Sequence, residues 1–158
     1  MIILGIDPGF GRMGCAILKK TGSGDNLIYS VCLTTDKKLS YDKRLLFLGK
    51  EIKKIISKFK PNVIAVEKVF FFKNQKTALQ VSEVRGIIFY LAASKKIPVK
   101  EFTPLQVKMS LTGYGRAEKQ QVQKMVQAIL NPPAGGKEIS KQDDEVDAIA
   151  IALTCSSV

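Results

Sequence analysis

Two carboxylates in this sequence stand directly at the ends of apolar segments. Asp7 follows Ile-Ile-Leu-Gly-Ile, and Glu67 follows Val-Ile-Ala-Val, whereas most other acidic residues stand among lysines. Short apolar runs of this kind are typical of strands that are buried on both faces. Because ligands bind at the carboxyl ends of the strands in open α/β sheets, we expect both carboxylates to emerge at one functional edge of a sheet.

A second pair of carboxylates lies near the end of the chain. Asp144 and Asp147 are three residues apart, which places them on one face of a helix. The apolar residues 148–153 predict that this helix packs against the body of the protein and holds its acidic start in place. We assign Asp143 to structure, because Ser140 and Asp143 have the spacing of a capping pair.

The chemistry of these four acids points to a divalent metal. The sequence contains no histidine, which excludes imidazole zinc sites and a histidine general base. Oxygen donors alone specify a hard cation such as Mg²⁺ or Mn²⁺. The chain has 25 Lys and Arg against 14 Asp and Glu, a formal charge of +11 that attracts polyanions. The matching reaction is two-metal phosphodiester hydrolysis, with ions roughly 3.5–4 Å apart.

Each acid also has an ordinary structural explanation. The helix macrodipole favours acids in a first turn, which would account for Asp144 and Asp147. An Asp that ends a strand before Pro-Gly is common in turns, which would account for Asp7. The coincidence of two strand-end acids with a helical pair favours the catalytic interpretation.

The segments that would position these acids alternate between strands and helices. Apolar runs predict strands at residues 1–6, 14–18, 29–33, 63–66 and 99–102. Periodicity and capping residues predict helices at 41–59, 77–94, from Thr103 onward, at 117–130 and from about Ser140. In the helix at 117–130 the residues expected to face inward are Val122, Met125, Val126 and Ile129. We therefore expect one α/β domain over residues 1–158, with a mixed central sheet and helices on both faces.

The composition indicates a globular cytoplasmic protein. The chain has 158 residues and is 46% apolar, which excludes a disordered linker. The longest apolar stretch, near residues 86–93, is too short to span a bilayer, and we expect no signal segment before the first strand. Cys15, Cys32 and Cys155 are scattered and odd in number, so we expect reduced thiols.

Several motifs, taken in their order along the chain, resemble the RuvC family of Holliday-junction resolvases. They are Gly5-Ile6-Asp7-Pro8-Gly9, Ala65-Val66-Glu67-Lys68-Val69-Phe70 with Asn74, Arg85-Gly86, Gln106-Val107-Lys108, Ala117-Glu118-Lys119, Gln121-Val122-Gln123 and Asp144-x-x-Asp147-Ala148-x-Ala150. The resemblance covers nearly the whole chain, and the ordered set is specific although each motif alone is weak. It implies an RNase H-like fold, a homodimer, and paired nicking of opposed strands of a four-way DNA junction during recombination and repair.

The resemblance also implies roles for single residues. Asp7, Glu67, Asp144 and Asp147 match the family's metal-binding catalytic acids, which implies two Mg²⁺ ions per subunit with Mn²⁺ as a substitute. A branch-migration complex of the RuvA and RuvB type is the implied partner. The residues expected to contact DNA are Phe70, Lys73, Lys76, Arg85, Lys108 and Lys119.

These DNA contacts rest on different arguments. Lys108, Lys119 and Phe70 match residues of the family, whereas Lys73 and Lys76 are expected near the acids because they follow Glu67 closely. Residues 70–72 are three successive phenylalanines, and all three cannot face one core. Either one of them stacks on a base at the branch point, or they cover a helix or a partner subunit.

The helix expected at 77–94 has apolar residues on more than one face. Such a helix needs a second surface to bury it, which the core or a partner chain can supply. A two-fold dimer through this helix would suit a substrate that itself has two-fold symmetry.

Two other functions compete with a junction nuclease. A nucleotide-binding protein of the actin or sugar-kinase type shares the Gly-rich turn at 7–11, but it needs a second subdomain that this length does not comfortably supply. A non-catalytic binder of branched DNA, or a relative that acts on RNA, would share the basic charge. Loss of cleavage on Asp7→Asn, with binding retained, separates an enzyme from a binder.

Overall fold

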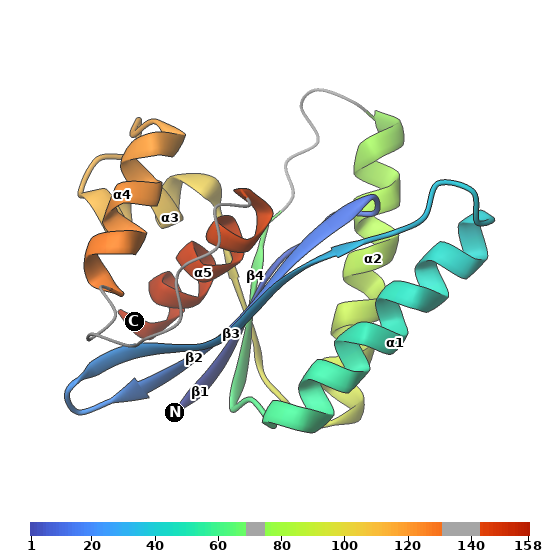
Figure 1. Ribbon diagram of the computed structural model, residues 1–158, viewed down its shortest axis with the longest axis horizontal. Helices are drawn as coiled ribbons and strands as arrows, with labels where there is room; N and C mark the ends of the chain where they lie inside the picture. Colours follow the sequence, from blue (N-terminus) through green and yellow to red (C-terminus); the bar gives the residue numbers. More distant parts are fainter. Residues whose placement is uncertain (69–74, 131–142) are drawn as a thin grey trace.

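A mixed five-stranded sheet lies at the centre of the protein (Figure 1). The computed structural model describes residues 1–68, 75–130 and 143–158, without the side chains of residues 75 and 76. The strands are β1 (Ile2–Asp7), β2 (Arg12–Thr21), β3 (Gly24–Thr34), β4 (Val63–Glu67) and β5 (Val99–Phe102), in the order β3-β2-β1-β4-β5. β1 is antiparallel to β2 and parallel to β4, which confirms the mixed sheet.

The β2–β3 hairpin is longer than the sequence predicted. The two strands pair from Arg12↔Thr34 to Thr21↔Gly24, although only their central parts are apolar. Backbone hydrogen bonds continue the ladder into the polar ends, because these bonds do not depend on side-chain polarity. The polarity pattern therefore predicted where both strands lie, but it predicted both of them too short.

Helices cover both faces of the sheet, as predicted (Figure 1). On one face lie α1 (Tyr41–Phe59) and α2 (Gln75–Ser94), and on the other lie α3 (Pro104–Thr112), α4 (Lys119–Ile129) and α5 (Asp143–Ser156). Neighbouring residues of β1 alternate between the two cores, since Ile3 packs with the second group of helices and Leu4 with the first. The sheet therefore separates two hydrophobic layers.

A capping box begins α3, and at the start of α4 the Gln121 side chain accepts from the backbone N–H of Glu118. The predicted start of α3 is confirmed: Thr103 accepts from the backbone N–H of Gln106, whose side chain accepts from Thr103 N–H. In α4, Val122 and Val126 are buried as expected. The inward placement of Met125 and Ile129 was wrong, because α4 lies at the outer edge of its layer and buries only a narrow stripe (the two side chains are 37% and 43% exposed).

The helix α2 is only partly covered by the rest of the chain. Val84, Ile88 and Ala92 are buried against the sheet and α1, whereas Leu79 and Tyr90 are exposed. In the described ranges, no helix is both long enough and apolar enough to cross a membrane. The helix α2 thus has more apolar surface than the core of this chain buries.

The helix α5 lies unusually close to β1 and β2, because two glycines face it. A Cβ atom placed on Gly5 would lie 2.3 Å from the carbonyl oxygen of Ala148, and one on Gly14 would lie 1.8 Å from that of Asp144. Real Cβ atoms do not approach backbone atoms so closely, so glycine is required at both positions. The small side chains of Ala148 and Ala152 complete this contact.

We predict that Gly14→Ala destabilises the protein by about 2 kcal/mol or more, because the new methyl group overlaps the α5 backbone and the helix must move outward. Urea unfolding of the wild type and the variant gives the difference in free energy directly. Gly22→Ala is the matched control, since a Cβ at Gly22 meets nothing within 4 Å. Equal stability of the two variants would contradict the close α5 contact.

Candidate active site

Four carboxylates from three elements gather at one edge of the sheet. Asp7 ends β1 and Glu67 ends β4, and these strands are adjacent and parallel, so both side chains leave the sheet at the same end. Asp144 and Asp147 stand in the first turns of α5, which packs across β1 and β2. The sequence predicted this convergence, and the sheet order together with the glycine contact explains it.

Asp7 is partly buried and feels the charges of the other three acids. Burial, followed by the negative charges of Glu67, Asp147 and Asp144 in that order of strength, raises the pKa of Asp7 from 3.8 to about 7, against a lowering by Lys119. Burial also raises the pKa of Glu67 and of Asp147. A cluster of this kind needs protons or cations to offset its charge.

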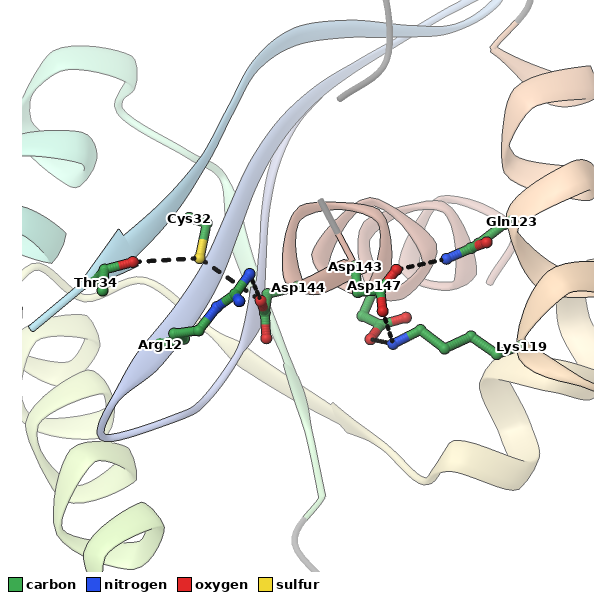
Figure 2. Close-up of polar contacts among 8 residues, drawn as sticks. All are labelled: Arg12, Cys32, Thr34, Lys119, Gln123, Asp143, Asp144 and Asp147. Carbon is green, nitrogen blue, oxygen red and sulfur yellow. Dashed lines mark hydrogen bonds and ion pairs between the residues drawn. The ribbon is translucent and has the colours of Figure 1, made fainter. Parts of the chain in front are cut away.

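Lys119 supplies one such cation from the start of α4. Its Nζ atom lies 2.9 Å from Oδ2 of Asp147 and 3.5 Å from Oδ2 of Asp143, and Gln123 donates to the other oxygen of Asp143 at 3.0 Å (Figure 2). Asp143 therefore links α5 to α4, which agrees with its assignment to structure. Its expected capping partner, Ser140, lies outside the described residues.

Arg12 supplies a second cation from the opposite side. Its guanidinium forms an ion pair of 2.5 Å with Asp144, and the Cys32 thiol lies 3.7 Å from the same carboxylate oxygen. Figure 2 shows Asp144 directed toward β2 and β3, whereas Asp143 and Asp147 are directed toward α4. A hydrogen bond with Cys32 and the charge of Asp144 raise the pKa of Arg12. The sequence analysis did not single out Arg12.

The register of the sheet could have identified Arg12. Gly14 faces α5, and Arg12 is two residues earlier in the same strand, so the two residues share a face. Cys32 and Thr34 pair with Gly14 and Arg12 across the hairpin. Without the register, the sequence offers only an arginine after a turn.

A cleft of about 280 Å³ opens beside the acids. Glu67 and Asp147 line it together with Lys108 and Lys119, and the remaining lining residues are Pro104, Val107, Val122, Ala150 and Ile151. Two of the predicted DNA-contacting lysines thus lie with two of the acids. The α3 and α4 helices, which contact α5, carry these lysines.

Arg85 takes a supporting position behind the acids. Its guanidinium donates to the backbone carbonyl of Glu67 and forms an ion pair with Glu101 of β5. These contacts fix the end of β4, and a direct contact of Arg85 with DNA stays a prediction. Phe70 and Lys73 lie outside the described residues, as does the side chain of Lys76.

The donor set fits a hard divalent cation, because it consists of carboxylate oxygens. Among the described residues, however, no three acidic or thiol side chains converge tightly enough to share one ion. The ion pairs explain this geometry, since Arg12 holds Asp144 on one side of α5 and Lys119 holds Asp147 on the other. Metal binding would therefore require rotation of these two aspartates toward Asp7 and Glu67.

The comparisons with known proteins agree with this fold. The family model described as crossover junction endodeoxyribonuclease RuvC matches residues 3–155. The RuvC of Ruminiclostridium cellulolyticum is 48% identical over 97% of this chain and 90% of its own length. The RuvC of Thermosipho melanesiensis is 43% identical over 96% of this chain and 94% of its own.

A solved structure matches the whole architecture. The Thermus thermophilus RuvC in complex with a Holliday junction substrate superposes with a TM-score of 0.88 at 30% identity, covering 98% of this chain and 92% of the other. The mixed five-stranded sheet with helices on both faces is that of an RNase H-like fold. Within that class, the chain belongs to the RuvC family of crossover junction endodeoxyribonucleases. RuvC nucleases depend on divalent metal ions.

We predict that Asp7→Asn stabilises the metal-free protein, and that the gain grows between about pH 4 and pH 7. The folded state keeps the Asp7 proton up to about pH 7, whereas the unfolded chain loses it near the ordinary pKa of 3.8. Rising pH therefore destabilises the wild type over this window. A shift of this size corresponds to about 4 kcal/mol at most, and relaxation reduces the expected gain to about 1–2 kcal/mol.

Urea unfolding with chelator at pH 4, 5.5 and 7.5 measures this gain. Asp36→Asn is the control, because Asp36 is an exposed carboxylate in the loop before α1. A gain that is absent at pH 7.5, or equal at all three values, would contradict the burial and repulsion assigned to Asp7.

Proposed function

We propose that this protein resolves four-way DNA junctions through a two-metal site built from Asp7, Glu67, Asp144 and Asp147. The observation that carries the proposal is the convergence of these acids at one sheet edge, where burial and the neighbouring negative charges raise the pKa of Asp7. Membership of the RuvC family supports the substrate class. The Thermus thermophilus RuvC, which has the same architecture, forms a complex with a Holliday junction substrate.

The four acids would hold two Mg²⁺ ions per subunit, and Mn²⁺ would substitute. Bound at these carboxylates, the ions supply an activated water and stabilise the leaving oxygen. The residues of the chain position this chemistry: β1 and β4 fix Asp7 and Glu67, while α5 presents Asp144 and Asp147. Burial of Asp7 in a repulsive field makes a divalent ion a favourable replacement for its proton.

Lysines beside the acids would position the DNA backbone. Lys108 and Lys119 line the cleft with Glu67 and Asp147, so a phosphate near the acids lies within their reach. Contacts of this kind orient a duplex without reading its sequence. Phe70, Lys73, Lys76 and Arg85 complete the expected contacts, and they stay predictions from the sequence.

The proposed assembly is a homodimer through α2. Leu79 and Tyr90 are exposed on this helix, although its other side is buried in the core. A two-fold dimer would present two sites to two opposed strands of a four-way junction. Cooperation with a branch-migration complex of the RuvA and RuvB type, and a cytoplasmic location, stay predictions.

We predict paired nicks near the crossover when the protein is incubated with a synthetic four-way junction and Mg²⁺ or Mn²⁺. Chelator abolishes the nicks, and a linear duplex of the same sequence is not cut at these positions. Denaturing gels with each strand labelled in turn measure both results. Junctions of several crossover sequences are needed, because nothing in the described residues fixes a base preference.

The variant Asp7→Asn distinguishes a nuclease from a non-catalytic binder. We expect nicking to fall more than a hundredfold, because loss of a ligand exceeds the 10–100-fold effect of residues that merely orient ligands. Junction affinity is retained, and Asp36→Asn keeps the wild-type rate. Cleavage by Asp7→Asn at the wild-type rate would refute the catalytic assignment.

We predict that the protein sediments as a dimer, and that Leu79→Lys shifts it toward monomer by placing a charge in the α2 contact. Leu105→Lys is the control, since Leu105 is equally exposed but stands on α3. Sedimentation velocity over a concentration series, with and without junction DNA, measures the change. A wild type that is monomeric under both conditions refutes the proposed dimer.

A further inference from the structure

The backbone of Arg12 is held in place beside the acidic site. It begins β2, and its strand neighbour Gly14 lies directly under the α5 backbone at Asp144. The side chain of Arg12 is 52% exposed, so it can leave its present partner without breaking the core. Figure 2 shows that its guanidinium and the Cys32 thiol meet Asp144 from the same side.

This contact directs Asp144 away from the other acids. The Arg12 guanidinium and Cys32 both contact one oxygen, Oδ2, of Asp144. The partner of Asp147, by contrast, is Lys119 on the α4 side. A cation already bound to a carboxylate lowers the affinity of that carboxylate for a metal ion, because the two positive charges repel and share the same oxygen lone pairs.

We propose that Arg12 is a positioning residue that competes with the divalent metal for Asp144. Without metal, Arg12 neutralises Asp144 and holds it toward β2 and β3. To serve as a metal ligand, Asp144 would have to rotate toward Asp7, and the guanidinium of Arg12 would have to move into solvent. Arg12 therefore sets the metal concentration that the site requires. This inference rests on the proposed role of Asp144 as a ligand.

Competition predicts the direction in which the metal affinity changes when Arg12 is replaced. Removing the charge of Arg12 leaves Asp144 free in the metal-free protein and removes one positive charge near the incoming ion. Even at the dielectric constant of water, a unit charge and a dication a few ångströms apart repel enough to change an affinity about tenfold. A residue that preorganised Asp144 for the metal would have the opposite effect.

The experiment measures Mn²⁺ binding to the DNA-free protein by the loss of the electron paramagnetic resonance signal of free Mn²⁺. We expect Arg12→Gln to bind Mn²⁺ about tenfold more tightly than the wild type. Arg12→Lys restores an affinity close to the wild type, because an ammonium can also neutralise Asp144. Circular dichroism establishes that each variant is folded.

Two further variants make the outcomes distinguishable. Lys54→Gln also removes one charge and one ion pair, that with Glu51 on α1, and it should leave Mn²⁺ affinity unchanged. Asp144→Asn should weaken Mn²⁺ binding. Unchanged or weaker binding by Arg12→Gln, with binding weakened by Asp144→Asn, refutes the competition alone. Unchanged binding by Asp144→Asn refutes the ligand role on which both proposals rest.

Discussion

The close contact of α5 with β1 and β2 is the constraint on which the rest of the structure depends. Only glycine at positions 5 and 14 lets the helix backbone rest on the sheet, and Ala148 and Ala152 keep the helix surface shallow. This contact fixes the height of the first turn of α5 above the strand ends. Asp144 and Asp147 therefore reach the carboxyl ends of β1 and β4, where Asp7 and Glu67 stand. A larger residue at either glycine would displace α5 and, with it, both Asp144 and Asp147.

Bringing these acids together opposes folding, and the chain offsets the repulsion with cations from its own surface. Lys119 and Arg12 stand on opposite sides of α5, each paired with one aspartate. Neither cation is paired with Asp7, whose pKa is instead raised by burial and by its acidic neighbours. The metal-free fold is thus strained electrostatically at the position where a dication would be most stabilising.

The sequence alone predicted the parts of the structure that depend on local pattern. Apolar runs located β1 and β4 and showed that Asp7 and Glu67 end them, and the capping box located α3. What it could not predict depends on register and packing. Arg12 reaches Asp144 because of the pairing of β2 with β1 and β3. Met125 and Ile129 fit a helical stripe, but the layer buries a narrower one. Periodicity states which face is apolar, not how much of it is covered.

Arg85 joins α2 to the sheet beside the acids. This residue belongs to α2, yet it fastens the carbonyl of Glu67 and pairs with Glu101 of β5. The helix with an uncovered apolar surface is therefore bonded directly to the strand end that carries Glu67. Pairing of α2 with a second copy would hold Arg85, and through it Glu67, in one position. The proposed dimer surface on α2 and the end of β4 would then be linked through the guanidinium of Arg85.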